Sequence, residues 1–221
     1  WLVLSTTTSY SAAGTDFSGS RYEVVCDSLL NAIEQPDSRM KDSHIAAHHS
    51  LYDRVSLTLP ATADDSLPTD ERIIRFADHE SPALAALYYN YGRYLLISST
   101  RPGSLPPNLQ GLWANGISTP WNGDYHTNIN IQMNHWPLEQ AALSELYQPL
   151  TTFIERLVPS GRDAARTFYG ARAQGWVLHM MTNVWNYTAP GEHPSWGATN
   201  TGGAWLCAHL WEHYQYTQDL A

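Results

Sequence analysis

The 221-residue chain contains little charge, and positive charge is the scarcer sign. Charged residues make up 15% of the sequence, against roughly 25% in an average soluble domain. The chain has 12 Lys and Arg against 21 Asp and Glu, so its net charge is −9, and Lys41 is the single lysine. A protein that holds nucleic acid by its phosphates needs a basic surface, so this balance argues against a nucleic-acid partner.

Cysteine and long apolar runs are also scarce. Cys26 and Cys207 are too few for a disulfide framework and lack zinc-finger spacing, so buried free thiols are expected. No window approaches the ~18 consecutive apolar residues of a membrane span, and no signal peptide is visible. Because 43% of the residues are hydrophobic, the composition excludes disorder and allows a sizeable core. The start at Trp1 and the unterminated helical pattern before Ala221 predict a piece of a longer protein.

The second half of the chain is poor in basic residues and rich in Trp, Asn and His. No basic residue occurs between Pro102 and Glu155 or after Arg172, and eight of the nine Trp lie between Trp113 and Trp211. Flat aromatic side chains with polar edges suit a site that stacks on sugar rings while amides bind the hydroxyls. For most of these Trp residues individually, we favour the alternative of a core between packed helices.

Residue periodicity predicts a mainly helical chain. Helical spacing of apolar residues occurs over 21–33, 38–54, 82–95, 129–146 (bent by Pro137), 149–169 and 203–218. Ser81-Pro82 is a typical helix start, and Gly170 is a typical stop. Strands are expected over 1–10 and 55–59, and loops over 64–70, 101–127 and 190–197. Since helices dominate after residue 80 without βαβ alternation, we predict an all-α body.

A polar cluster directly follows the long irregular stretch 101–127, and a loop of that length usually has a function. His126, Asn128 and Asn130 lie at i, i+2 and i+4, so in extended backbone the three side chains share one side. Together they can hold a water molecule or several hydroxyls. Asn is neutral and cannot remove a proton alone, so a carboxylate must lie behind it. The alternative is an Asn-rich junction whose amides cap the following helix.

A second cluster lies on the last predicted helix. Helical spacing puts Trp205, His209, Glu212 and His213 on one face. A Glu among Trp and Tyr side chains is expected to have its pKa raised by desolvation, as a general acid requires. The same residues match the H-x-x-E-H pattern of zinc peptidases, which needs a further metal ligand. A third interpretation is a helix that buries two His and one Glu in paired hydrogen bonds.

Two other groups of residues are weaker candidates. His44, His48 and His49 offer helical spacing without a Glu to act as base, so we expect structural histidines. Glu192 is a candidate second carboxylate, although a solvated loop is the preferred interpretation of its surroundings.

Several long motifs, in the same order along the chain, resemble the inverting α-L-fucosidases of glycoside hydrolase family 95. They are Arg93–Ser99, Pro107–Trp113, Pro120–Asn130, Gln132–Trp136 and Gly202–Tyr214. The resemblance covers roughly residues 20–221. It implies the end of an N-terminal β-domain over 1–15, a helical linker over 16–76, and the N-terminal half of an (α/α)6 catalytic barrel over 77–221.

The resemblance also implies roles for individual residues. Glu212 would be the general acid that protonates the glycosidic oxygen, while Asn128 and Asn130 would position the attacking water. The other expected substrate contacts are His126, Trp121, Asp124, Trp205 and His209. In the family the base carboxylate lies in later barrel helices, so this segment alone is expected to have no turnover. The family allows Asp in place of Asn183, which leaves the choice between α-L-fucosides and α-L-galactosides open.

The sequence thus predicts a fragment of an inverting exo-α-L-fucosidase that releases terminal α-1,2-linked fucose from glycans. No cofactor, metal, nucleic acid or membrane span is expected, and the parent protein would be secreted, periplasmic or at the cell surface. The alternatives are an H-x-x-E-H zinc peptidase and a non-catalytic fucose-binding module.

Overall fold

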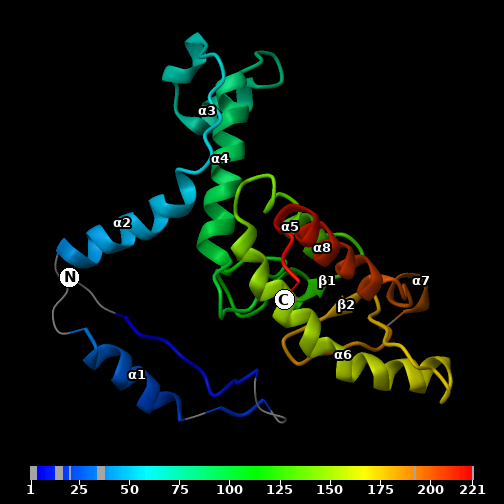
Figure 1. The fold of residues 1–221 in the computed structure, drawn as a ribbon. Helices are drawn as coiled ribbons and strands as arrows, with labels where there is room; N and C mark the ends of the chain where they lie inside the picture. Colours follow the sequence, from blue (N-terminus) through cyan, green and yellow to red (C-terminus); the bar gives the residue numbers. More distant parts are fainter. Residues whose placement is uncertain (1–3, 13–16, 20, 34–37, 192, 221) are drawn as a thin grey trace.

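The computed structural model describes residues 4–12, 17–19, 21–33, 38–191 and 193–220, and it is mainly helical (Figure 1). The α-helices are α1 (Tyr22–Asn31), α2 (Ser38–Tyr52), α3 (Thr69–Arg75), α4 (Pro82–Ser99), α5 (Asn130–His135), α6 (Gln148–Tyr169), α7 (Pro194–Gly197) and α8 (Gly202–Thr217). Three 3₁₀ turns are η1 (Ala63–Ser66), η2 (Pro120–Gly123) and η3 (Ser144–Tyr147). The strands β1 (Tyr125–His126) and β2 (Met181–Thr182) form a small antiparallel pair.

The core lies where α5, α6 and α8 meet the C-terminal half of α4 (Figure 1). On α6, buried apolar residues recur at helical spacing, and they are Leu150, Phe153, Ile154 and Leu157. The helix ends as predicted at Gly170, whose φ of +108° suits glycine. The predicted all-α body is confirmed, and its helices are consistent with part of an (α/α)6 barrel.

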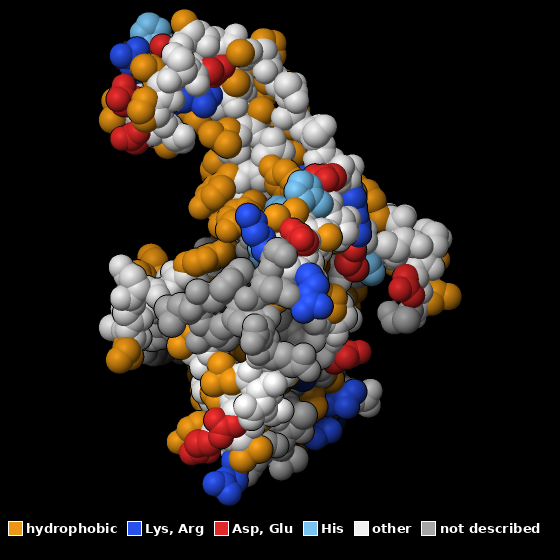
Figure 2. All heavy atoms as spheres, turned by 90° about the vertical axis from the view of Figure 1, so that its left-hand side faces the viewer, with side chains coloured by type: hydrophobic (Ala, Val, Ile, Leu, Met, Phe, Trp, Pro, Cys, Tyr) orange, Lys and Arg blue, Asp and Glu red, His pale blue; other side chains and the backbone are white. Residues whose placement is uncertain are grey.

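The start of α4 forms as the sequence predicts. The Ser81 side chain accepts a hydrogen bond from the backbone N–H of Leu84, and Pro82 occupies the first turn. Figure 1 shows α3 beside the first half of α4 and away from α5, α6 and α8. Exposed apolar side chains gather over this upper part in Figure 2, and they include Ile73, Ile74 and Tyr88.

A buried arginine joins α4 to two other segments. Arg93 is 2% exposed, and its guanidinium donates to the backbone carbonyls of Leu51, Tyr52, Val55 and Ala141 at 2.7–3.3 Å. Three of these carbonyls belong to the end of α2 and the residues after it, where helical carbonyls lack intrahelical partners. Arg93 thereby satisfies the end of α2 and fixes it against α4.

Neither predicted strand in the first part of the chain forms among the described residues. Residues 1–3 lie outside the described residues, and over 4–12 the only pairing is an isolated bridge between Tyr10 and Ser18. Residues 55–59 form no strand, because side chains of α4 take their carbonyls. Arg93 binds the carbonyl of Val55, and Asn90 Nδ2 donates to that of Leu57.

Three loop and helix predictions also need correction. The expected loop 64–70 contains most of η1 and the start of α3, because Arg72 pairs with Asp65 at 2.5 Å and stabilises both turns. The expected loop 190–197 ends in α7, with Pro194 in its first turn. The expected helix 129–146 is split into α5, turns and η3, since Pro137 has no N–H and Ala142 adopts a φ of +54°.

Among the helices in the described part of the chain, none is long and apolar enough to cross a membrane. The proposed domain boundaries at residues 15 and 76 stay predictions.

Candidate active site

A pocket of about 440 Å³ gathers three of the residues singled out in the sequence. Its walls are Trp121, Asn122, Asp124, His126, Met180, Met181 and Trp196. The first four come from the end of the long irregular stretch, Met180 and Met181 come from the start of β2 and the residue before it, and Trp196 comes from α7. The structure thus brings Trp121, Asp124 and His126 into one pocket, and it adds Met180, Met181 and Trp196 to the lining, which no local pattern indicates.

Local backbone geometry presents these side chains. Trp121, Asn122 and Gly123 have consecutive φ values of +50°, +56° and +63°, so the chain turns sharply just before β1. Successive side chains of β1 then point to opposite sides. Tyr125 packs against Phe153 in the core, whereas His126 faces the pocket and its ring lies 6.4 Å from that of Trp121.

Burial shifts the pKa values of two side chains in the pocket. It raises the pKa of Asp124, partly offset by the nearby His126, and it lowers the pKa of His126, partly offset by Asp124. Both shifts favour the neutral forms. An exposed Trp ring beside a carboxyl and an imidazole suits a polyol, because the ring can stack on a C–H face while the polar groups bind hydroxyls.

Asn128 and Asn130 flank this pocket without lining it. Between His126 and Asn128, Thr127 is fully buried, and its N–H donates to the carbonyl of Met180 at 2.8 Å. The alternative that the two amides cap the next helix is not supported, because the N-cap of α5 is Ile129 and no side chain caps it. Asn128 is exposed and Asn130 half-buried, so both amides are available to a ligand.

The first residues of α8 pack against the same backbone. A Cβ on Gly202 would lie 2.4 Å from Thr127 Oγ1 and 2.8 Å from the carbonyl oxygen of His179, so only glycine allows this approach. A Cβ on Gly203 would lie 2.8 Å from the Trp176 ring. The N-terminal end of α8 is therefore adjacent to the strand that carries His126.

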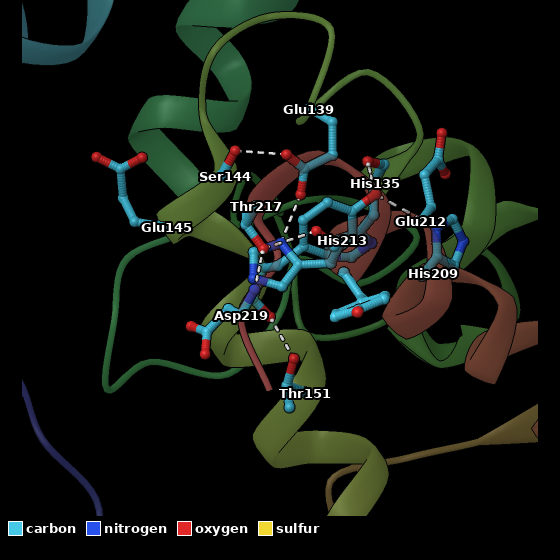
Figure 3. A network of polar contacts seen from close by, with 12 residues as sticks. His135, Glu139, Ser144, Glu145, Thr151, His209, Glu212, His213, Thr217 and Asp219 are labelled. Carbon is cyan, nitrogen blue, oxygen red and sulfur yellow. Dashed lines mark hydrogen bonds and ion pairs between the residues drawn. The ribbon is translucent and has the colours of Figure 1, made fainter. Parts of the chain in front are cut away.

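The predicted face of α8 forms, and Figure 3 shows His209, Glu212 and His213 near the segment that carries Glu139. Glu212 lies ten residues after Gly202, which is about 15 Å along the helix axis. There its Oε1 accepts a hydrogen bond from Gln140 Nε2 at 3.1 Å. Trp205 and His209 lie beside Trp136, with ring centroids 6.3 and 6.5 Å away. The structure therefore brings Trp205, His209 and Glu212 onto one face, and it does not bring Glu212 to His126.

Comparison with known proteins identifies the family. The catalytic-domain model of glycosyl hydrolase family 95 matches residues 37–221. The chain belongs to glycosyl hydrolase family 95. This confirms the resemblance found in the sequence.

Relatives of this family 95 chain carry fucosidase names. It is 39% identical over 230 residues to a probable alpha-fucosidase A of Aspergillus niger, a match that covers 100% of the chain and 29% of the relative. It is 42% identical over 182 residues to alpha-L-fucosidase 2 of Arabidopsis thaliana, covering 80% of the chain and 21% of the relative. A probable alpha-fucosidase A of Aspergillus oryzae is 34% identical over 221 residues, covering 89% and 30%. The chain thus spans less than a third of these relatives' lengths.

The remaining candidate residues of the family 95 chain are those of the H-x-x-E-H motif, the histidines of α2, and Glu192. In the described part of the chain, no group of three or more His, Cys, Asp or Glu is arranged to hold a metal ion. In the H-x-x-E-H motif, His213 Nδ1 binds the carboxylate of Glu139 at 2.5 Å. On α2, His49 pairs with Asp53 at 2.6 Å, and the His48 ring stacks on Tyr52. Glu192 lies outside the described residues.

A fully buried histidine links α5 to the contacts around α8. The nitrogen His135 Nδ1 lies 2.7 Å from the carbonyl oxygen of Ile131, so it carries the proton and donates. Tyr147 donates its hydroxyl proton to the carbonyl of His135, and its oxygen lies 3.4 Å from His209 Nδ1. Burial lowers the pKa of His135 to about 4.

This shift predicts a loss of stability in mild acid. Between pH 6.5 and about 4 the unfolded chain binds a proton at His135 that the folded chain does not, so the free energy of unfolding falls as pH falls. A shift from 6.5 to about 4 corresponds to about 3 kcal/mol. Urea unfolding at pH 6.5 and 4 measures the loss, and His135→Asn should remove most of that difference. An unchanged pH dependence in the variant would contradict the assignment.

Proposed function

We propose that this chain is part of an α-L-fucosidase that releases terminal α-1,2-linked fucose from glycans with inversion at the anomeric carbon. The observation that carries the proposal is the pocket around His126, in a chain whose family is that of glycosyl hydrolase 95. The fucosidase names of the relatives favour the same substrate class. Action on terminal glycan residues fits a secreted, periplasmic or cell-surface protein, which we include in the proposal.

The pocket offers the contacts that a deoxy sugar needs. Fucose is a neutral ring with hydroxyls on its edges, apolar C–H faces and a methyl group. Asp124 and His126 would bind hydroxyls, while the exposed ring of Trp121 would stack on a C–H face. Trp196 and Met181, which also line the pocket, would contact the methyl group.

An inverting glycosidase also needs a water molecule and two carboxyls ~6.5–9.5 Å apart, one as acid and one as base. We propose that Asn128 and Asn130 hold that water, since both amides are available beside the pocket. Glu212 is the hypothesis for the acid. In that role it would have to reach a glycosidic bond lying along α8, because about 15 Å of helix separates it from Gly202.

The test is hydrolysis of 2′-fucosyllactose by the full-length protein, followed by proton NMR of the released sugar. Inversion gives β-L-fucose as the first product, before mutarotation mixes the anomers. Initial release of α-L-fucose would contradict the inverting mechanism. Calorimetric binding of fucose without any turnover would favour the non-catalytic binding module instead.

A further inference from the structure

The proposed chemistry leaves one buried carboxylate unused. The Glu139 side chain has no exposed surface, and Oε1 lies 2.5 Å from His213 Nδ1 on α8. Its second oxygen accepts a hydrogen bond from the hydroxyl of Ser144. Figure 3 shows Glu139 between these two partners, one on its own segment and one on α8.

The pairing matters because a buried charge is costly unless it is compensated. A carboxylate without a partner in the protein interior destabilises the fold by several kcal/mol, and a good partner offsets most of that cost. Among the described residues, the Glu139 carboxyl contacts His213 Nδ1 through one oxygen and the Ser144 hydroxyl through the other. The attachment of α8 to this segment is therefore tied to one atom pair.

Neighbouring contacts restrict how α8 can rotate about its axis. Gln140 donates to Glu212, and the Tyr147 ring lies 5.4 Å from the His213 ring. These side chains hold the same face of α8, so together they fix its rotation as well as its position. At the other end of α8, Gly202 is in close contact with Thr127, between His126 and Asn128.

We infer that Glu139 is a positioning residue for the active site. It sets the rotation and axial position of α8 through His213, and α8 transmits that position through Gly202 to the backbone that carries His126 and Asn128. The effect on catalysis rests on the proposed function, whereas the effect on the backbone does not.

Glu139→Gln is the main variant, because glutamine keeps the size and can still accept from Ser144 but loses the charge. Glu145→Gln is the matched control. Glu145 lies on the same segment and pairs with Arg54 at 2.7 Å, but its side chain is 43% exposed and its partner Arg54 lies outside α8. His213→Gln breaks the same pair from the other side and replaces Glu139→Gln should that variant fail to fold.

The first readout is amide hydrogen exchange in the full-length protein. Glu139→Gln is expected to speed amide exchange in two peptides: residues 202–206, at the N-terminal end of α8, and residues 125–130, which contact that end. Glu145→Gln is expected to leave exchange in both peptides unchanged. An increase confined to residues 136–147 and 209–217 would overturn the inference, since it would show a purely local role. This readout needs no activity, so it stays decisive even when the protein releases no fucose.

The second readout is the kinetics of fucose release, measured well below the unfolding temperature. Misplacement of catalytic groups by an ångström can cost up to about 10²-fold in rate, so kcat in Glu139→Gln is expected to fall about tenfold, with a smaller change in KM. The double variant with His213→Gln should lose no more than the worse single variant, because the pair acts as a unit. Additive losses, or a kcat within twofold of wild type, would overturn the inference.

Discussion

Replacing Asn128 and Asn130 together by Ala is expected to lower kcat for fucose release by about 10²- to 10³-fold, the range typical for removing a positioned hydrogen-bond donor. Both amides lie beside the His126 pocket, and α5 begins without a side-chain cap. Their loss should therefore remove contacts to the water or the sugar and cost the fold little. Steady-state kinetics on 2′-fucosyllactose and far-UV circular dichroism together measure both effects.

Asn134→Ala is the control for this prediction. Asn134 lies on α5, as Asn130 does, but its amide donates to the carbonyl of Asn108 at 3.4 Å and it lines a separate cavity of about 710 Å³ between α4 and residues 107–113. The kcat of the Asn134→Ala variant should stay within a few-fold of the wild-type value. Equal losses in both variants would show that the Asn128 and Asn130 effect is a general consequence of disturbing α5.

The part of the site that could be predicted from the sequence is the part that lies close together in the chain. Trp121, Asp124 and His126 fall within six residues of the irregular stretch 101–127; its length indicated a functional loop, spacing singled out His126, and the family resemblance added Trp121 and Asp124. Met181 and Trp196 could not be found this way, because Met181 reaches the pocket through the pairing of β1 with β2 and Trp196 lies on α7, far along the chain from His126. That pairing joins two-residue strands 55 residues apart, so no local pattern indicates it.

The fold shows the same division between local and long-range signals. Periodicity and capping residues located α1, α2, α4, α6 and α8, since amphipathic spacing is a property of the helix itself. The alternation at 55–59 predicted a strand, but a strand forms only where a partner strand supplies hydrogen bonds. At that position Arg93 and Asn90 occupy the carbonyls instead, and both lie more than 30 residues further along the chain.

The role of Glu212 illustrates how a helix face can be predicted while its purpose stays open. Sequence spacing put Trp205, His209 and Glu212 on one face, and this arrangement is present in α8. The same face packs on residues 136–147, which the spacing within a single helix could not reveal. A carboxyl at this position can serve as an acid for a bound glycan or as a contact that holds the helix.

Glu212→Gln in the full-length protein separates these two roles through the leaving group. A general acid matters most when the leaving group is a poor one, such as the sugar alkoxide of lactose, and much less for an activated aryl fucoside. If Glu212 is the acid, Glu212→Gln is expected to lower the rate of 2′-fucosyllactose hydrolysis by about 10²- to 10⁴-fold. Hydrolysis of dinitrophenyl α-L-fucoside should fall far less.

Glutamine keeps an acceptor oxygen for Gln140, so this variant preserves the contact seen at 3.1 Å and tests the proton alone. Gln140→Leu is the converse control, because it removes the contact and leaves the carboxyl able to donate its proton. Losses below tenfold on both substrates in Glu212→Gln would assign Glu212 to the attachment of α8. The acid would then have to come from a carboxyl nearer the N-terminal ends of α5 and α8, where His126, Asn128 and Asn130 gather.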